Sequence, residues 1–148
     1  WSRSTRNGSP ISLAMVDVDF FKPYNDHYGH AMGDRTLRRV AKALGSVLMR
    51  PADVIARYGG EEFVLLLPET DAFAAKGVAD RALRKISRMN LPHLFSGAAK
   101  HVSVSIGLVT TQISDGLTAK IFMSAADKNM YLAKENGRNR IVASVLGF

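Results

Sequence analysis

The chain has 148 residues, of which 47% are hydrophobic, and a formal net charge of +7. This length suits one domain with a sizeable core, and no apolar run reaches the roughly 18 residues of a membrane span. The absence of cysteine excludes disulfides and thiolate metal sites and suits a reducing cytoplasm. The basic surplus favours a polyanionic partner, but aromatic residues do not interleave with the basic ones, so nucleic acid is not expected.

The first two segments are a basic stretch and a buried strand. Residues 1–10 resemble the end of a basic helix that runs into a turn, so we expect a single domain over residues 1–148, cut from a longer protein. Residues 11–18 form a nearly unbroken apolar run, which is typical of a central strand covered on both faces. Asp17 and Asp19 lie at its end, where carboxylates are costly unless they are paired or bind a ligand.

Two helices and a hairpin follow. A short helix is predicted over residues 20–28, and a long amphipathic helix from Asp34 to about Met49. Asp34 is then either the N-cap of the long helix or a site residue. Strands at residues 54–58 and 63–67 are expected to pair around a two-glycine turn, because both glycines can adopt positive φ.

The second half of the chain alternates helices and strands. Helices are predicted over residues 72–89 and 117–135, a loop over 91–100, and strands over 102–108 and 139–144. The resulting order is β-α-α-β-β-α-β-α-β. It indicates an α+β domain related to the ferredoxin-like arrangement, with a central, mainly antiparallel five-stranded sheet flanked by helices.

Carboxylates and cations are expected to gather at one end of this sheet. If their strands are neighbours, Asp17, Glu61 and Glu62 converge, and with the Val18 carbonyl they form an oxygen-rich half-shell for Mg²⁺. Two such ions suit phosphoryl or nucleotidyl transfer. A lysine and an arginine four residues apart, Lys134 and Arg138, are placed to hold a triphosphate; the simpler interpretation is that they are ordinary cations at a helix C-terminus.

Several motifs stand in a fixed order along the chain and carry a family resemblance. They are Asp17-Val18-Asp19-Phe20-Phe21-Lys22, Asn25-Asp26, Gly29-His30, Gly33-Asp34, Arg57-Tyr58-Gly59-Gly60-Glu61-Glu62-Phe63, Ala126-Asp127, Tyr131, Ala133-Lys134 and Gly137-Arg138-Asn139. With this order and spacing the chain resembles a GGDEF domain of a bacterial diguanylate cyclase, in the variety whose turn contains Gly-Gly-Glu-Glu-Phe.

The resemblance implies a nucleotidyl-cyclase-like fold and a reaction. Two GTP molecules would condense into cyclic di-GMP with loss of two pyrophosphates, at the interface of a homodimer in which each domain presents one GTP. Asp17, Glu61 and Glu62 would hold Mg²⁺ or Mn²⁺ with the help of the Val18 carbonyl. Glu61 would promote deprotonation of the attacking hydroxyl. Asp19 is interpreted as a structural acceptor rather than a metal ligand.

The resemblance also assigns residues to the substrate. Asn25 and Asp34 would read the guanine edge, because Asp34 can accept from two guanine donors that adenine does not offer. Lys134 and Arg138 would hold the β- and γ-phosphates. The cleft would further be lined by Phe20, Phe21, Lys22, His30, Gly59 and Gly60. His30, with His27, is not interpreted as a metal pair.

A second site is implied for the product. The segment Arg50-Pro51-Ala52-Asp53 matches by position the Arg-x-x-Asp inhibitory motif of many such cyclases, where Arg50 and Asp53 would clamp cyclic di-GMP. Arg81, on the next predicted helix, falls where the family often supplies a second arginine. From the four residues alone, a helix C-terminal cation and a turn residue are the simpler interpretation, whereas the offset from the glycine turn favours the inhibitory one.

Alternatives to an active cyclase stay open. Domains of this fold can lose turnover and act as receptors for cyclic di-GMP or GTP, and a related cyclase could make a different product. The complete Gly-Gly-Glu-Glu-Phe turn favours activity, and Asn25 with Asp34 favours guanine. Family members usually carry an Asp-x-Leu-Thr-Gly-Leu segment before the domain, and this chain is expected to start after it, as the cytoplasmic output part of a longer signalling protein.

Overall fold

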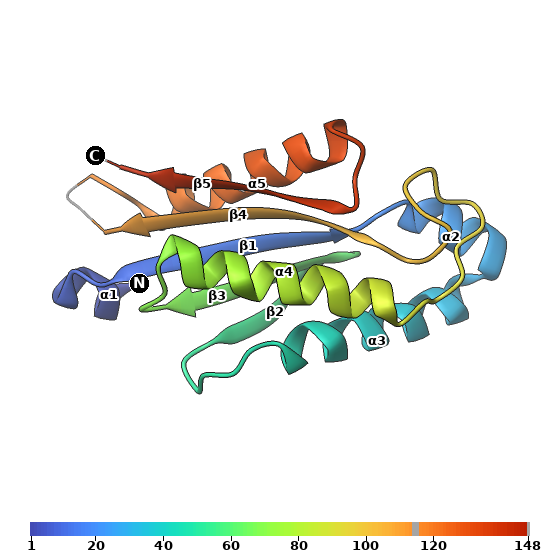
Figure 1. The fold of residues 1–148 in the computed structure, drawn as a ribbon, viewed down its shortest axis with the longest axis horizontal. Helices are drawn as coiled ribbons and strands as arrows, with labels where there is room; N and C mark the ends of the chain where they lie inside the picture. Colours follow the sequence, from blue (N-terminus) through green and yellow to red (C-terminus); the bar gives the residue numbers. More distant parts are fainter. Residues whose placement is uncertain (114–115, 148) are drawn as a thin grey trace.

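Five strands form one mixed sheet in the order β2-β3-β1-β4-β5. The structure is a computed structural model that describes residues 1–113 and 116–147. The strands are β1 (Pro10–Val18), β2 (Val54–Gly59), β3 (Glu62–Pro68), β4 (Val104–Gln112) and β5 (Arg140–Leu146). Neighbouring strands are antiparallel except for β4 and β5, which are parallel (Figure 1).

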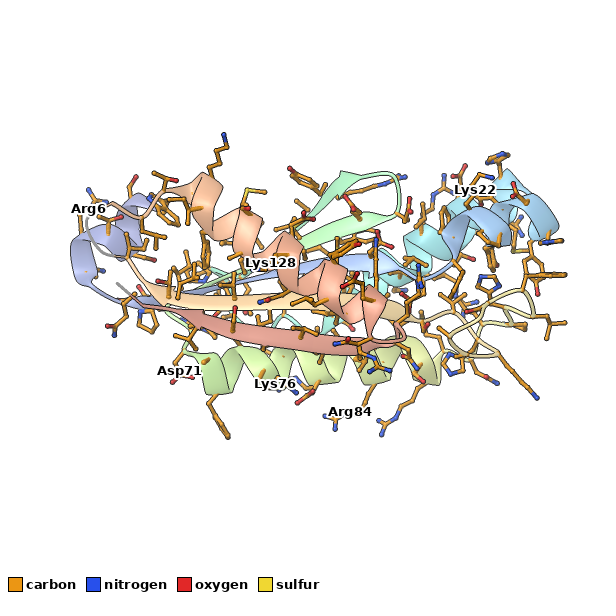
Figure 2. The ribbon with its side chains drawn as sticks, turned by 90° about the horizontal axis from the view of Figure 1, so that it is seen from above. Arg6, Lys22, Asp71, Lys76, Arg84 and Lys128 are labelled. Carbon is orange, nitrogen blue, oxygen red and sulfur yellow. The ribbon has the colours of Figure 1, made fainter. Side chains whose placement is uncertain are left out.

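Helices cover both faces of this sheet. They are α1 (Ser2–Asn7), α2 (Phe21–Tyr28), α3 (His30–Ser46), α4 (Ala72–Arg88) and α5 (Ala119–Glu135). Seen from above, α4 with Lys76 and Arg84 lies on one side of the sheet and α5 with Lys128 on the other (Figure 2). The predicted α+β class and the mainly antiparallel five-stranded sheet are confirmed, and the basic N-terminal stretch is the helix α1.

The central strand β1 supplies side chains to two hydrophobic clusters. Ala14, Val16 and Val18 join the larger cluster with α3 and α4, whereas Leu13 and Met15 join the smaller one with α5. Residues 11–18 are all buried, as predicted for a strand covered on both faces. The end of β1 therefore lies between two packed layers, in a position where polar groups are shielded from water.

Two predicted helix boundaries were wrong. The helix predicted from Asp34 to about Met49 begins at His30 and ends at Ser46, so Asp34 lies inside α3 and is not its N-cap. Gly29, with φ 88°, occupies that capping position and lets α2 turn directly into α3. The sequence did not predict the start at His30 because Gly33 weakens the helical pattern, glycine being unfavourable inside a helix.

A close approach between α5 and β4 sets the position of one cation. A Cβ atom at Gly107 would collide with the Ala126 carbonyl oxygen, so this glycine is required for the helix to lie against the strand. Lys134, in the last turn of α5, is thereby brought to the end of β1.

Within residues 1–113 and 116–147, no helix has both the length and the apolar character that crossing a membrane requires.

Candidate active site at the end of strand β1

The hairpin turn between β2 and β3 is joined to the end of β1 by backbone pairing. Asp17 stands opposite Glu62 in the antiparallel register of β1 and β3. The Val18 amide donates a hydrogen bond to the Glu61 carbonyl oxygen at 3.2 Å. The strands are neighbours, as the site prediction required, and the two turn carboxylates are brought to the strand that carries Asp17.

Asp17 is a buried carboxylate in a crowded electrostatic environment. Asp17 is 4% exposed, and its Oδ2 atom lies 2.9 Å from Lys134 Nζ. Burial raises the pKa of Asp17 from its ordinary value of 3.8 to about 6; the hydrogen bond and charge of Lys134 oppose the rise, and the charges of Glu61 and Glu62 add to it. The contact with Lys134 therefore does not offset the cost of burying the Asp17 carboxylate.

The residues here fit a divalent cation, although they do not form a closed metal cage. No group of three His, Cys, Asp or Glu side chains in the described part of the chain is arranged to hold a metal ion. The pKa of Asp17 is raised first by burial and only further by the charges of Glu61 and Glu62, and a cation bound here would favour its charged form. Carboxylate oxygens are the donors that Mg²⁺ prefers, with water and phosphate oxygens completing its shell.

The glycine turn presents bare backbone to open space. Gly60 has φ 46°, a left-handed conformation that favours glycine, and its carbonyl accepts a hydrogen bond from Arg57 Nε at 2.8 Å. A Cβ atom at either Gly59 or Gly60 would have no described protein atom within 4 Å. Packing inside the domain therefore does not explain Gly59, and a ligand approaching the backbone here would have room.

Asp19 is a structural acceptor, as predicted. Its carboxylate accepts hydrogen bonds from Ser103 Oγ at 2.7 Å, Ser105 Oγ at 2.6 Å and the Asn139 amide at 3.0 Å. The network ties β1, β4 and the turn after α5 together. Sequence reasoning did not assign the two serines a role. The pattern that could have identified them is their alternation with apolar residues, which puts both serines on the same side of an extended segment, toward the buried Asp19.

Of the two candidate guanine-reading residues, Asn25 lies in α2 and Asp34 near the start of α3. Asn25 Oδ1 is buried and has no hydrogen-bond partner among the described residues. A Cβ atom at Gly33 would collide with this oxygen, so Gly33 makes room for the Asn25 carboxamide. Asp34 lines a cavity of about 470 Å³ whose wall includes Leu37 and Phe63. This volume falls in the usual range of small-molecule sites.

The other candidate cleft residues differ in exposure. Phe21 is buried in the core and stacked on Tyr24, with ring centroids 6.1 Å apart. Lys22 is exposed and pairs with Asp26 at 3.5 Å. His30, the first residue of α3, is also exposed. Phe20 and Arg138 contact each other, since the guanidinium carbon lies 4.3 Å from the centre of the Phe20 ring.

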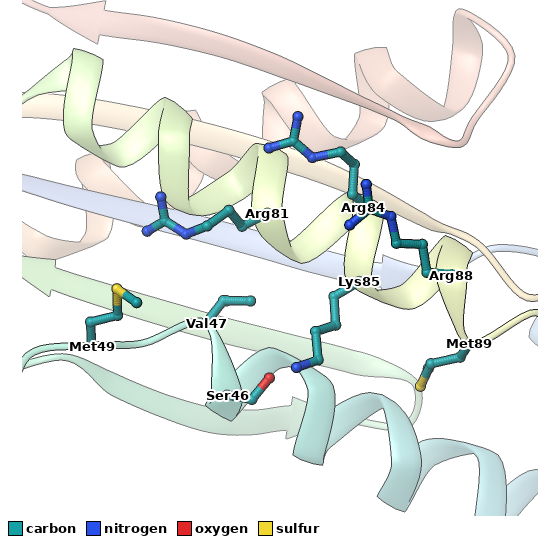
Figure 3. Close-up of a pocket in the computed structure, with 8 residues that line it drawn as sticks. All are labelled: Ser46, Val47, Met49, Arg81, Arg84, Lys85, Arg88 and Met89. Atoms are coloured by element: carbon teal, nitrogen blue, oxygen red, sulfur yellow. The ribbon is translucent and has the colours of Figure 1, made fainter.

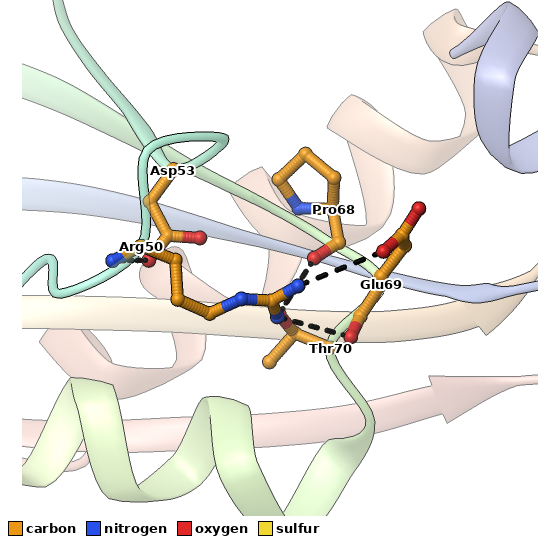
Figure 4. Close-up of polar contacts among 5 residues, drawn as sticks. All are labelled: Arg50, Asp53, Pro68, Glu69 and Thr70. Atoms are coloured by element: carbon orange, nitrogen blue, oxygen red, sulfur yellow. Dashed lines mark hydrogen bonds and ion pairs between the residues drawn. The ribbon is translucent and has the colours of Figure 1, made fainter.

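Arg50 and Asp53, the candidate inhibitory pair, close a turn at the other end of the sheet. Figure 4 shows Arg50 Nη1 donating to the carbonyl oxygens of Pro68 and Glu69 and to Thr70 Oγ1, at 3.2, 3.1 and 3.0 Å. The Arg50 amide donates to Asp53 Oδ2 at 3.3 Å. Asp53 Oδ1 is buried and has no partner among the described residues.

Arg81 lies near this pair. A cavity of about 520 Å³ is lined by Arg50, Asp53 and Arg81 together. Arg81 also lines a neighbouring cavity of about 660 Å³, which is rimmed by three further cations of α4, shown in Figure 3: Arg84, Lys85 and Arg88. The three candidate inhibitory residues are thus brought together beside a strongly basic surface, which suits an anionic ligand.

The fold is an α+β domain in which the buried Asp17 carboxylate and the hairpin that carries Glu61 and Glu62 meet at one end of the sheet. Residues 1–140 match the family described as diguanylate cyclase, GGDEF domain. The chain therefore belongs to the GGDEF domain family of diguanylate cyclases.

Curated relatives from this family align with most of the chain. Diguanylate cyclase A of Treponema denticola is 44% identical over 134 residues, which cover 90% of this chain and 35% of that protein. Response regulator PleD of Caulobacter vibrioides is 38% identical over 140 residues, which cover 95% of this chain and 30% of that protein. The chain thus spans about a third of the length of these relatives.

The similarity of structure is equally extensive. The crystal structure of the coiled coil and GGDEF domain of DgcB from Caulobacter crescentus, in complex with c-di-GMP, superposes with a TM-score of 0.84 at 30% identity and covers 97% of this chain and 74% of that one. The active GGEEF domain of a diguanylate cyclase from Vibrio cholerae superposes with a TM-score of 0.80 at 30% identity, covering 99% and 90%.

Proposed function

We propose that this domain condenses two GTP molecules into cyclic di-GMP with release of two pyrophosphates. The observation that carries the proposal is the buried Asp17 carboxylate, whose pKa is raised to about 6 at the strand end that Glu61 and Glu62 also reach. In a GGDEF family chain, this cluster beside an open glycine turn suits a metal-bound triphosphate.

Each carboxylate has a role in this proposal. Asp17, Glu61 and Glu62, with the Val18 carbonyl, would hold Mg²⁺ or Mn²⁺, which neutralises phosphate charge and activates the attacking hydroxyl. Glu61 would accept the proton of the 3′-hydroxyl. The hydroxyl oxygen then forms a bond to the α-phosphorus of the second GTP, and the bond to the β-phosphate oxygen breaks as pyrophosphate leaves. The 3′-hydroxyl of the second GTP then attacks the α-phosphorus of the first in the same way, which closes the ring and releases the second pyrophosphate.

The remaining candidate residues would bind and orient GTP. Asn25 and Asp34 would pair with the guanine edge, and the unpartnered Asn25 oxygen supports this, because a buried acceptor gains most from a ligand donor. Lys134 and Arg138 would hold the β- and γ-phosphates. Lys134 would exchange its contact with Asp17 for phosphate when a metal ion binds Asp17. Phe20, Lys22, His30, Gly59 and Gly60 would line the cleft, and Phe21, which is buried, would support its wall from the core.

Two copies of the domain are needed for one product in this proposal. Each copy would present its GTP to the other, so activity depends on a homodimer. The domain would act in the cytoplasm as the output part of a longer signalling protein. Arg50, Asp53 and Arg81 would bind the product and slow turnover; the buried, unpartnered Asp53 oxygen beside two arginines supports a ligand there.

The test is to incubate the domain with GTP and Mg²⁺ and to resolve the products by chromatography. We expect cyclic di-GMP and pyrophosphate in a ratio of one to two. Exchange of Asp71, the exposed N-cap residue of α4, to Asn serves as a matched control and should leave the yield unchanged, because Asn also caps helices. Tight binding of cyclic di-GMP without turnover would assign the domain to the receptors, and a different cyclic product would overturn the guanine assignment.

A further inference from the structure

His93 is a buried histidine in the loop between α4 and β4, far along the chain from the candidate site. It is 1% exposed, and its ring lies edge-on to Tyr24, with centroids 5.1 Å apart and an interplanar angle of 88°. Figure 1 shows this loop passing beside α2. Its Nδ1 has no partner among the described residues, so the single polar contact of the ring is made through Nε2.

That contact is with the backbone of Phe20. His93 Nε2 lies 2.9 Å from the Phe20 carbonyl oxygen, and because a carbonyl only accepts, Nε2 carries the proton and donates. Phe20 has φ 51° and ψ 40°, a left-handed conformation that is rare for an aromatic residue and needs support from its surroundings. The same carbonyl accepts from the Tyr24 amide at 3.1 Å, which begins helix α2.

The side chain of Phe20 in turn supports Arg138. The guanidinium carbon lies 4.3 Å from the centre of the Phe20 ring, within the range of a cation–π contact. A Cβ atom at Gly97, in the same loop as His93, would lie 3.1 Å from the Phe20 ring, so this loop also limits where the ring can sit. A continuous series of contacts therefore runs from His93 through Phe20 to Arg138.

We propose that His93 is a positioning residue for the triphosphate: by holding the Phe20 carbonyl it fixes the ring on which Arg138 stacks, and so aims the guanidinium at the β- and γ-phosphates. This inference rests on the proposed function, in which Arg138 binds phosphate. A histidine with a purely structural role would affect all ligands of the domain alike, whereas a histidine that acts through Arg138 affects only ligands that carry the β- and γ-phosphates.

The experiment compares two nucleotides by calorimetric titration in the presence of Mg²⁺. The first is guanosine 5′-(α,β-methylene)triphosphate, which cannot release pyrophosphate, and the second is GMP, which lacks the outer phosphates. The variant His93→Phe keeps an aromatic ring against Tyr24 but cannot donate, and His93→Gln keeps a donor. Gly97→Ala is a second probe, because its methyl group presses on the Phe20 ring from an exposed position. Thermal unfolding of every variant monitors the fold.

We expect His93→Phe and Gly97→Ala to weaken binding of the triphosphate about tenfold, as for coupled residues in contact, and GMP binding less than about twofold. His93→Gln should retain most of the triphosphate affinity. In an Arg138→Ala background, His93→Phe should cause no further loss. Equal losses for both nucleotides, additive losses in the double variant, or an undiminished triphosphate preference in folded His93→Phe and Gly97→Ala would each overturn the inference. If the native domain bound both nucleotides equally, the phosphate site of the proposed function would itself be wrong.

Discussion

The two candidate ligand regions of this domain are built in different ways. At the end of β1, the buried Asp19 carboxylate accepts hydrogen bonds from Ser103, Ser105 and Asn139. These residues stand 84, 86 and 120 positions further along the chain. At the other end of the sheet, Arg50 binds Asp53 three positions away and residues 18 to 20 positions away, mostly on the surface. The first region therefore depends on the whole fold, and the second can be changed with little effect on it.

The largest expected effect is on turnover at the end of β1. Asp17→Asn and Glu62→Gln should each reduce cyclic di-GMP formation by a factor of about a thousand or more, because each removes a charge expected to hold the metal ion. Initial rates with saturating GTP and Mg²⁺ measure this. Circular dichroism should show an intact fold for both variants, and full activity in either one would rule out the metal assignment.

The next effect concerns the number of domains in one active site. If two copies must meet, the specific activity of the isolated domain should rise with protein concentration, approaching proportionality where the dimer is scarce. A hundredfold dilution series measures this. A coiled coil fused upstream should remove the dependence by raising the effective concentration. Specific activity that stays constant over the series, together with a monomeric species in sedimentation, would contradict a two-domain reaction.

A stability measurement tests the contrast between the two regions directly. Asp19→Ala leaves two buried hydroxyls and one backbone amide without their acceptor, so we expect a loss of about 3 kcal/mol in the free energy of unfolding. Arg50→Ala should cost less than about 1 kcal/mol, because water can replace exposed partners. Urea unfolding of both variants measures the difference. Similar losses would show that the Arg50 turn is as integral to the fold as the Asp19 network.

Product binding should respond to a change at Arg50, at the other end of the sheet from Asp17. Arg50→Ala should weaken cyclic di-GMP binding at least about tenfold, since a bidentate arginine contact is lost, and turnover should no longer stall as product accumulates. Calorimetric titration and full progress curves measure the two effects. Arg35→Ala, an exposed arginine on α3, is the matched control. An unchanged affinity of Arg50→Ala for cyclic di-GMP would show that Arg50 makes only structural contacts and does not bind the product.

The last effect is a pH-dependent change in stability. The pKa of Asp17 is about 6 in the folded domain, above its ordinary value of 3.8, so the unfolded chain releases this proton first as the pH rises. The native domain therefore loses stability between about pH 4 and pH 6. Asp17→Asn does not titrate, so relative to the native chain it should gain about 1 to 3 kcal/mol above pH 6 and little below pH 4. A constant difference across this range would contradict the burial of the Asp17 charge.

The sequence predicted the elements because each follows a local pattern. The apolar run of β1, the helical spacing of α4 and the hairpin of β2 and β3 lie within short windows, and the structure confirms them. The hairpin turn itself differs from the prediction: it consists of Gly60 and Glu61, because Gly59 ends β2 and only Gly60 has a positive φ. The start of α3 was missed because Gly33 weakens the helical signal, and its reason, the room it leaves for Asn25, lies outside that window. Motif order added the family, and with it the candidate site residues.

What the sequence determined by itself is the set of chemical groups and the elements that carry them: carboxylates at a strand end and a hairpin turn, and cations at the end of a helix. Tertiary structure alone decided the partners. Lys134 meets Asp17 because Gly107 allows α5 to lie close on the sheet, and His93 reaches the Phe20 carbonyl across 73 positions of chain. Local patterns carry no information about such contacts, because packing of distant segments, and not the neighbouring residues, sets their distances.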